Sequence, residues 1–403
     1  MTETIEQLPT FPMERRCPFQ LPAEYDRLME QAPVSQVTRA NGATAWLVAR
    51  HELVRKVLAD SRVSSDRTRP NNPSLVPIPP AFLQPASRPL IVQDPPEHTL
   101  HRRLIISEFA VRRVQTMRAG IQTIVDDCID TMLAGERPVD LLEVLARPVP
   151  TLVICELLGV SYAEREIFYD ASNRVFSEQS TPMDIGVAIQ DLRQFLDSKI
   201  AVKEREAGDD LLSRLVNRYR EEGVYDRERV ISTSLGLLIA GHETTTSMIA
   251  LGVALLLDTP EQLAILKAEP DIVTTAVEEL LRYISIADMI TARTVTDDME
   301  VGDQVIPADA GLFALLGAAN RDPDVFPDPD RLDLRRAEAR QHVAFGYGAH
   351  QCLGANLARL ELEIVYRTLF ERIPDLRLAV PLEELPFKNK TALYGLSSLP
   401  VTW

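Results

Sequence analysis

The stretch AFGYGAHQCLG, from Ala344 to Gly354, contains the cysteine on which the interpretation of this chain depends. Glycines surround Cys352, and residues 355–370 have the apolar spacing of a helix. Exposed N–H groups at the N-terminus of a helix stabilise a thiolate, so this thiol has a position suited to chemistry. Taken alone, the stretch leaves four roles open: a buried structural thiol, one half of a disulfide, a nucleophile or a metal ligand.

Length, composition and charge limit the classes of function. The 403 residues, 45% of them hydrophobic, suffice for one large domain or two ordinary ones with an extensive core. A formal net charge of −16 argues against non-specific binding to nucleic acid or to an anionic membrane, because both require a surplus of Lys and Arg. The first residues are acidic and lack an apolar run, so we expect no signal peptide, no membrane anchor and a cytoplasmic location.

The other cysteines offer Cys352 no obvious partner. Cys17, Cys128 and Cys155 are widely spaced, and a chain without a secretory signal seldom relies on a disulfide framework. We therefore expect reduced thiols, of which one or two at most serve chemistry.

Hydrophobic periodicity predicts a mainly helical chain with a minor β region, an α+β architecture. Asn41-Gly42, between apolar runs at 34–37 and 45–48, predicts a hairpin with a type I′ turn. Helical periodicity runs from about 92 to 282, and strand patterns return at 299–306 and at the C-terminal end. Within a single domain of residues 1–403, the β part is expected at about 34–60, 284–320 and 380–403, and the helical body at about 92–283 and 353–373.

One long helix dominates this pattern. Residues 226–257 form a continuous helical run, about 48 Å long at 1.5 Å per residue. Thr259, followed by proline and with Gln262 three positions on, predicts a capping box that starts the next helix. Residues 242–246, HETTT, interrupt the apolar run at its middle, and polar groups inside a buried helix need a reason. Seven prolines between residues 70 and 89 predict a long irregular segment that serves as a lid or binding wall.

Several familiar motifs are excluded. His242-Glu243 begins like the zinc motif HExxH, but Thr246 stands in the place of the second histidine. The GxG at 346–348 begins like a dinucleotide loop, but Gln351 occupies the position of the third glycine. The chain also has no GxSxG, P-loop or CxxC pair. The common hydrolase, nucleotide and zinc functions therefore lose their support.

The cysteine stretch is the first of four elements that remain. It has the form Phe345-x-x-Gly348-x-His350-x-Cys352-x-Gly354. Its glycines let the backbone approach a large flat ligand, because a Cβ at these places would collide with it.

The other three elements each have a simpler alternative. Glu279 and Arg282 are three apart on one helical face, where a surface ion pair is the ordinary explanation. Glu243-Thr244 lies in the long helix, where a hydroxyl that bonds back to the backbone can bend the helix. His98-x-x-x-Arg102 follows DPPE, where a solvated helical pair is expected.

Together, the order and separation of these elements resemble those of the cytochromes P450, above all the soluble actinomycete enzymes that oxidise macrolides, secosteroids and herbicides. The resemblance runs from about Phe11 to Trp403. It rests on the stretches CPFQLP, DPPEHTLHR, VICELLGV, LIAGHETTT, EELLRY, NRDP, FGYGAHQCLG and LPVTW. It implies the cytochrome P450 fold, a triangular helical body with a long central helix and small β-sheets.

By this resemblance Cys352 is the thiolate ligand of the iron in haem b, iron protoporphyrin IX. Phe345 shields the sulfur, and Gly354 belongs to the same haem-binding stretch. The haem propionates require cationic or N–H partners. The residues at the corresponding positions are His98, Arg102, Arg293 and His350.

Two more motifs of the family match. Glu279 and Arg282 correspond to its ExxR pair, which an arginine from a later segment joins. Arg331 is expected to be that arginine, although the family usually has Glu and Phe where this chain has Asp330 and Leu332.

The oxygen-activation motif is matched by Ala240-Gly241-x-Glu243-Thr244. The resemblance implies that Gly241 leaves room over the haem for dioxygen. Thr244 then hydrogen-bonds the activated dioxygen, and Glu243 connects it to a proton supply.

The implied function is that of a haem-thiolate monooxygenase. It inserts one oxygen atom from O2 into a bulky hydrophobic substrate, by hydroxylation or epoxidation, in secondary metabolism or xenobiotic oxidation. Family positions predict apolar substrate walls at 70–89 and 168–200. The individual substrate contacts expected are Ala240, Thr244, Ile286, Met289, Ile290 and Leu393.

No flavin or ferredoxin segment is attached, so a separate ferredoxin and ferredoxin reductase are expected to supply electrons to a monomeric enzyme. Because ferredoxins are acidic, a basic docking surface is expected. Its candidate residues are Arg102, Arg103, Arg112 and Arg113. The alternative from another class is an accessory or binding protein with this fold that does not activate oxygen.

Overall fold

The structure is a computed structural model of the chain. It describes residues 8–15, 18–75, 84, 87–161, 164, 170–171, 174–175, 180–206, 208–388 and 393–403. The chain forms two compact units. The first comprises residues up to 77, 275–352 and 387–395, and the second comprises 78–274, 353–386 and 396–403. The α+β architecture predicted from periodicity is confirmed.

A six-stranded sheet forms the centre of the first unit. In spatial order its strands are β1 (Thr10–Phe11), β2 (Val34–Arg39), β3 (Thr44–Val48), β9 (Gly311–Ala314), β6 (Ala292–Val295) and β4 (Val63–Ser64). The pair β3–β9 is parallel, whereas β2–β3 and β6–β9 are antiparallel. A separate hairpin joins β7 (Met299–Val301) to β8 (Gln304–Ile306). The sheet thus combines strands from residues 10–64 with strands from residues 292–314, whereas the C-terminal residues 400–402, also expected in the β part, lie in a separate small sheet.

The hairpin predicted at Asn41-Gly42 joins β2 to β3, but its turn type is not the predicted one. A type I′ turn needs positive φ at both central residues. Gly42 has a φ of +81°, whereas Asn41 is not among the residues with positive φ. The strands end at Arg39 and resume at Thr44, so the loop is longer than two residues, and the Asn41 side chain accepts a hydrogen bond from the Ala43 amide (3.2 Å). The type I′ prediction is therefore wrong.

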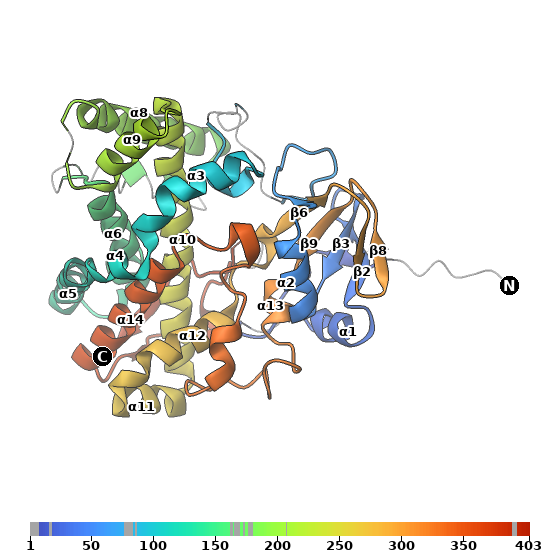
Figure 1. Ribbon diagram of the computed structural model, residues 1–403. Helices are drawn as coiled ribbons and strands as arrows, with labels where there is room; N and C mark the ends of the chain where they lie inside the picture. The colour runs from blue at the N-terminus through green and yellow to red at the C-terminus, as the bar shows by residue number, and fades with distance from the viewer. Residues whose placement is uncertain are drawn as a thin grey trace. The chain divides into compact units, whose positions relative to one another are not determined.

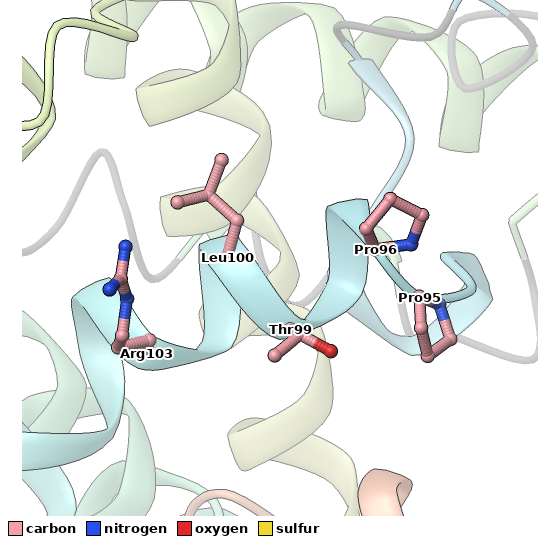
Figure 2. Close-up of a pocket in the computed structure, with 5 residues that line it drawn as sticks. All are labelled: Pro95, Pro96, Thr99, Leu100 and Arg103. Atoms are coloured by element: carbon pink, nitrogen blue, oxygen red, sulfur yellow. The ribbon is translucent and has the colours of Figure 1, made fainter.

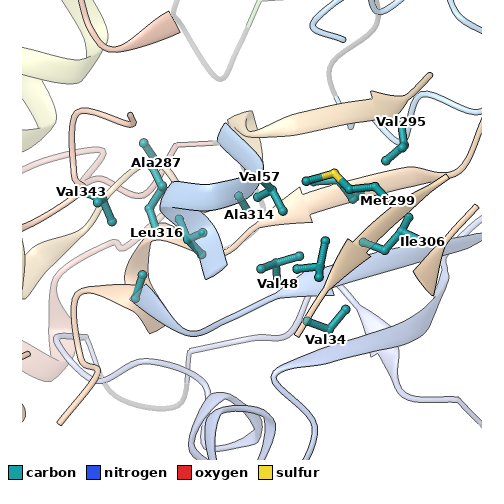
Figure 3. Close-up of a cluster of buried hydrophobic side chains, with 14 residues drawn as sticks. Val34, Val48, Val57, Ala287, Val295, Met299, Ile306, Ala314, Leu316 and Val343 are labelled. Carbon is teal, nitrogen blue, oxygen red and sulfur yellow. The ribbon is translucent and has the colours of Figure 1, made fainter. Parts of the chain in front are cut away.

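The α-helices of the first unit are α1 (Glu24–Gln31), α2 (His51–Ala59), α12 (Val273–Ile284) and α13 (Leu316–Ala319), of which α2 packs against strands of the sheet. Val57 of α2 belongs to one buried apolar cluster with Val48 and Ala314 of the sheet (Figure 3). Val343, which immediately precedes the cysteine stretch, lies in the same cluster. The approach to that stretch is therefore part of the packed core.

The second unit is mainly helical (Figure 1). Its α-helices are α3 (Glu97–Ile105), α4 (Val111–Gln115), α5 (Arg118–Ala134), α6 (Pro148–Leu158), α8 (Pro182–Lys203), α9 (Leu211–Glu221), α10 (Arg227–Asp258), α11 (Pro260–Ala268) and α14 (Ala355–Arg372). Helix α10 packs against α6, α8 and α14. A small sheet has the order β10 (Arg377–Leu378), β11 (Pro400–Thr402) and β5 (Val139–Asp140).

The limits of α10 agree with the run predicted at 226–257. Asp226 caps its N-terminus, accepting a hydrogen bond from the Glu228 amide (2.9 Å). The capping box predicted at Thr259 does not form, because the Thr259 hydroxyl donates to the carbonyl of Leu255 at 2.7 Å. That hydroxyl therefore completes the end of α10 instead of starting α11. Among the described residues no helix is by itself long and apolar enough to span a membrane, whereas α10 and α11 together, bent by 104°, meet the criteria of length and composition.

Helices α10 and α14 approach closely at Gly252. A Cβ at this position would lie 2.0 Å from the Tyr366 hydroxyl oxygen. That hydroxyl donates to the carbonyl of Met248 at 2.5 Å. Glycine at 252 therefore makes room for a buried cross-helix hydrogen bond between the long helix and the helix that follows the cysteine stretch.

Helix α14 also carries a buried carboxyl group, Glu361. Its side chain is 4% exposed, and Oε2 has no hydrogen-bond partner within the described part of the chain. Burial raises the pKa of Glu361 to about 8. In the unfolded chain a Glu carboxyl titrates near ~4.3, so the folded protein keeps a proton that the unfolded chain releases, and stability falls as pH rises through this window.

We expect Glu361→Gln to remove this loss of stability. The variant should gain melting temperature relative to the wild type, and the gain should increase from about pH 6 to about pH 8. Thermal unfolding followed by circular dichroism across this range measures it. Glu371→Gln, at an exposed site on the same helix, is the matched control and should show no such trend. A gain that is independent of pH would contradict the assignment.

Candidate functional site

The cysteine stretch is a closed loop at the end of the first unit. The Cys352 amide donates to the carbonyl of Phe345 at 2.8 Å, and the Gln351 amide donates to Gly348 at 3.1 Å. Gly348 has a φ of +72°, and a Cβ there would lie 2.4 Å from the carbonyl oxygen of Leu58. The loop therefore requires glycine at 348, and it holds the thiol of Cys352 in an exposed position.

Cys352 lies three residues before α14 begins. It differs from the other two described cysteines, which are buried. Burial raises the pKa of Cys128 to about 12, so that thiol stays protonated at neutral pH. Of the described thiols, Cys352 alone is exposed and able to act as a ligand or nucleophile.

Three contacts within the first unit anchor the residues that enter the loop. The Val343 amide donates to Oδ1 of Asn320 at 2.7 Å. Nδ1 of His342 accepts a hydrogen bond from the Ala344 amide at 3.1 Å, so Nε2 carries the proton and donates to the Glu278 carboxylate at 3.0 Å. His342 is buried, and sequence reasoning did not identify its role.

Glu279 and Arg282, the predicted pair on α12, are hydrogen-bonded through both carboxylate oxygens. Arg282 Nε donates to Oε2 at 2.7 Å, and Nη2 donates to Oε1 at 2.9 Å. Both side chains are completely buried, so the simple alternative of a surface pair does not hold. Arg282 also donates to the carbonyls of Asn320 and Pro329, each at 2.9 Å.

The third member of this cluster is Arg336, and the prediction of Arg331 is corrected. Arg336 Nε donates to Glu279 Oε1 at 3.1 Å, and its side chain is buried. The Arg331 side chain is 67% exposed and pairs with Asp333 at 3.2 Å, while only its carbonyl joins the cluster, accepting from Arg336 at 2.8 Å. The chain turns at 328–333, so the arginine nearer in sequence points outward.

The predicted oxygen-activation residues lie at the middle of α10. On one helical face, Leu237, Gly241 and Thr244 are half-buried and Ala240 is exposed, whereas the residues on the opposite face are buried. The Thr244 hydroxyl donates to the carbonyl of Ala240 at 2.7 Å, which is the back-bonding geometry considered as the alternative for this residue. An accessible face in the middle of a long apolar helix indicates a ligand surface.

The four residues predicted to bind the haem propionates are divided between the two units, two in each. His98 and Arg102 are one turn apart on α3, where His98 is buried and Arg102 is half-buried. Burial, with a smaller contribution from the Arg102 cation, lowers the pKa of His98 to about 4, so at neutral pH its ring offers an N–H group without charge. Arg293 is a buried residue of β6, and His350 is half-buried in the short 3₁₀ turn Gly348–His350.

Three of the predicted substrate contacts come from one loop after α12, where the 3₁₀ turn Asp288–Ile290 follows Ile286. The Tyr394 amide donates to the Ile286 carbonyl at 3.0 Å, which ties the strand-like segment containing Leu393 to this loop. The backbone of Met289 belongs to the turn, but its side chain lies outside the description. Of the predicted apolar walls, residues 76–83, 85–86 and most of 168–179 lie outside the described residues.

Taken one by one, these groups have the chemistry that a large flat ligand with carboxylates, such as haem, requires. A Cβ at Gly241, Gly346 or Gly354 would meet no atom within 4 Å, so the backbone at all three positions borders open space. The exposed thiol in the first unit can supply a soft anionic ligand, and the second unit has an accessible apolar face on α10. Among the described residues no group of three or more His, Cys, Asp or Glu side chains is placed to hold a metal ion.

Comparisons with known proteins agree with this chemistry. The sequence profile of the family Cytochrome P450 matches residues 37–374. Cytochrome P450 105A3 of Streptomyces carbophilus is 48% identical over 99% of this chain and 97% of its own length. The vitamin D3 dihydroxylase of Streptomyces griseolus is 47% identical over 98% and 97%. The crystal structure of cytochrome P450 MoxA from Nonomuraea recticatena superposes with a TM-score of 0.92 at 49% identity, covering 98% of each chain.

Proposed function

Because this chain belongs to the cytochrome P450 family and is therefore a monooxygenase with haem b, we propose that Cys352 is the protein ligand of the haem iron. The single observation that supports this assignment is the exposed thiol of Cys352 in a loop held by Gly348 and by the amide of Cys352 itself. The bound haem supplies the redox chemistry by which dioxygen is activated. The chain's own residues hold the haem and deliver protons.

The first of these tasks is to hold the haem carboxylates. We assign it to Arg102 and Arg293, as charged donors, and to His98 and His350, as ring N–H donors. The low pKa of His98 supports a neutral N–H group there. We also assign to Phe345 the shielding of the sulfur, and the bond from the Cys352 amide to the Phe345 carbonyl supports this by tying the two residues together.

Proton delivery is the second task, and we assign it to Thr244 and Glu243. The Thr244 hydroxyl lies on the accessible face of α10, and its proton is directed at the Ala240 carbonyl. The hydroxyl must therefore rotate before it can donate to a ligand, and its oxygen can then accept a proton from a donor on its other side. Glu243, adjacent and half-buried, is the nearest group in the sequence that can pass protons inward from solvent.

The test of the central assignment is the difference spectrum of the reduced, carbon-monoxide-bound protein. Thiolate ligation gives a band shifted strongly to the red of that given by histidine ligation. We expect the shifted band in the purified holoprotein. A haem-containing protein that shows only the unshifted band would overturn the assignment of Cys352.

Thr244→Ala should separate dioxygen consumption from product formation. Without the hydroxyl, the delivery of protons to dioxygen is no longer controlled. We therefore expect the amount of product formed per dioxygen consumed to fall at least about tenfold, while dioxygen is still consumed. An oxygen electrode combined with product analysis measures the ratio. Thr244→Ser, which keeps the hydroxyl, is the control and should retain most of the coupling. Equal coupling in all three proteins would remove Thr244 from proton delivery.

For the substrate we propose a bulky apolar molecule of the secosteroid, macrolide or terpenoid kind. Support comes from the apolar face of α10 at Leu237 and Ala240, from Ile286 and Ile290, and from the name of one relative, vitamin D3 dihydroxylase. Vitamin D3 is therefore a suitable first probe, added to the ferric protein and followed by the shift of its main absorption band. Binding of small ionic compounds, with no response to any lipophilic probe, would contradict this class.

We also propose that a ferredoxin and its reductase supply the electrons, and that the ferredoxin docks on basic groups near the end of α3. One buried carboxylate there, Glu108, has three guanidinium groups within 4 Å, those of Arg113, Arg214 and Arg218. This leaves a local surplus of positive charge on an acidic chain. Exposed apolar side chains, Ile106 and Val111, adjoin it, and the shallow pocket of about 590 Å³ along α3 includes Arg103 (Figure 2).

Charge reversal at Arg112, an exposed residue of α4, tests the docking surface. At low ionic strength Arg112→Glu should slow haem reduction by a reduced ferredoxin about fivefold to tenfold, because steering between opposite charges is lost. The difference should vanish near ~1 M salt, where the screening length is about 3 Å. Arg205→Glu, an equal change of charge on an exposed residue of the same unit, is the control. Identical rates for both variants at every salt concentration would exclude the surface.

A further inference from the structure

We propose that Arg15, in the N-terminal segment, is a positioning residue that sets the shape of the substrate pocket. It does so by holding the two segments that carry Ile286, Ile290 and Leu393. This inference rests on the proposed function, because it takes these three side chains to face the substrate. It concerns a group of residues that we call the Arg15 cluster: Arg15, Tyr25, Asp288 and Tyr394.

The first contact of Arg15 is with the end of α12. Its Nη2 donates to the carbonyls of Ile284 at 3.1 Å and Ser285 at 2.9 Å. Carbonyls at a helix C-terminus lack partners within the helix, and a cation satisfies them well. Ser285 has a φ of +45°, a conformation that residues other than glycine rarely adopt, so the turn that leads into the loop needs support from outside. The guanidinium of Arg15 supplies part of it, and Asn320 Nδ2, which donates to the Ser285 hydroxyl at 2.8 Å, supplies another part.

The second contact is with Tyr394, next to Leu393. The guanidinium lies over the Tyr394 ring, 4.2 Å from the ring centre, in a cation–π arrangement. The same tyrosine donates its amide proton to the Ile286 carbonyl and its hydroxyl proton to the carbonyl of Pro18 at 2.6 Å. One cation and one ring therefore join the N-terminal segment, the loop after α12 and the segment 393–394.

The third interaction of Arg15 is electrostatic: its positive charge acts on the carboxylate of Asp288. Asp288 is half-buried, and its carboxylate accepts hydrogen bonds from the Gly317 amide and the Tyr25 hydroxyl. A Cβ at Gly317 would lie 2.6 Å from a carboxylate oxygen of Asp288, so glycine there makes the close approach possible. Burial raises the pKa of Asp288, and the Gly317 amide and the positive charge of Arg15 oppose that rise. Asp288 begins the 3₁₀ turn that ends at Ile290, so this carboxylate fixes the turn from its buried side.

These contacts have a common consequence for the pocket. Ile286 follows Ser285 directly, Ile290 is two residues after Asp288, and Leu393 precedes Tyr394. Each of these three predicted substrate contacts is thus within two residues of Ser285 or Tyr394, which Arg15 contacts, or of Asp288, on which its charge acts. Removal of the cation should leave the fold and the cysteine loop in place but allow these three side chains to move, so the pocket should discriminate less between ligands of different shape.

The experiment compares three holoproteins with the wild type: Arg15→Gln, Arg15→Lys and, as the control, Arg27→Gln on the exposed side of α1. The probes are the isomers 1-, 2- and 4-phenylimidazole, which present the same groups in different shapes. Their dissociation constants are measured by the spectral shift of the ferric haem. We expect the ratio between the tightest and the weakest isomer to shrink about fivefold in Arg15→Gln, as for the loss of one hydrogen bond. It should be largely restored in Arg15→Lys, whose ammonium can still reach the two carbonyls, and unchanged in Arg27→Gln.

The reduced, carbon-monoxide-bound spectrum of each protein separates this inference from the proposed function. If the wild type lacks the shifted band, the assignment of Cys352 as the iron ligand fails. This failure concerns the proposed function and not the positioning role of Arg15. If all proteins show that band and Arg15→Gln keeps the wild-type ratio between isomers, the positioning role is overturned. Should Arg15→Gln fail to fold, Tyr394→Leu removes the ring beneath the guanidinium and must produce the same narrowing for the inference to stand.

Discussion

Cys352→Ser should abolish substrate oxidation and remove the red-shifted band of the reduced, carbon-monoxide-bound protein. A serine hydroxyl remains protonated at neutral pH, whereas a cysteine in a loop of backbone N–H groups supplies a thiolate. The loss should be complete, because no other described thiol is exposed. Product analysis with vitamin D3 as the probe, together with the spectrum, measures both effects.

The control for this variant is Cys128→Ala. Cys128 is buried in α5 and its pKa is raised to about 12, so it cannot supply a thiolate at neutral pH. This protein should keep the shifted band, with a loss of stability of about 1 kcal/mol from the small cavity. A Cys352→Ser protein that retains both band and turnover, or a Cys128→Ala protein that loses the band, would refute the assignment.

The second large effect is expected at the buried cluster around Glu279. Glu279→Gln removes a charge that faces Arg282 and Arg336, both within hydrogen-bonding distance and buried with it. Breaking a buried ion pair from one side typically costs about 3–5 kcal/mol, because the partner charges stay buried without compensation. We expect the variant to accumulate poorly and to unfold at a much lower urea concentration than the wild type.

Arginines at 336 and 331 form a matched pair for the same cluster. Arg336→Ala should destabilise by a similar amount, because it leaves the Glu279 carboxylate without one of its cations. Arg331→Ala, at a side chain that is 67% exposed, should change the free energy of unfolding by less than about 0.5 kcal/mol. Urea unfolding of both proteins measures the difference. Equal effects, or a larger effect at Arg331, would contradict the structure.

This pair also illustrates where prediction from sequence reached its limit. Glu279 and Arg282 could be paired in advance, because two residues three apart on a helix face each other whatever surrounds them. The arginine that joins them comes from more than fifty residues away, through an irregular segment with no period that would tell which side chains point inward. No local pattern favoured Arg336 over Arg331, and only the structure shows that the nearby Asp333 amide also donates to Glu279 (3.0 Å).

Two predictions from short local motifs, the capping box at Thr259 and the type I′ turn at Asn41-Gly42, were also wrong. Thr259 followed by proline has the pattern of an N-cap, but its hydroxyl donates to the carbonyl of Leu255 and makes no capping hydrogen bond to α11. Asn41-Gly42 has the composition of a type I′ turn, but the strands end at Arg39 and resume at Thr44, and this longer loop has positive φ only at Gly42. In each case a short motif allowed two geometries, and the neighbouring element decided between them.

The sequence by itself determined what depends on local spacing. The α+β architecture, the limits of α10 and the ion pair on α12 follow from periods of two or 3.6 residues. The role of Cys352 does not follow from its own stretch, which leaves four roles open, but from the resemblance of several motifs together to the cytochromes P450. Family membership follows from the same motifs. Only the tertiary structure decided which distant groups complete them: Arg336 beside Glu279, His342 behind the cysteine loop, and Arg15 against the loop after α12. Contacts between segments far apart in the chain depend on how irregular connections turn, and no local period encodes that.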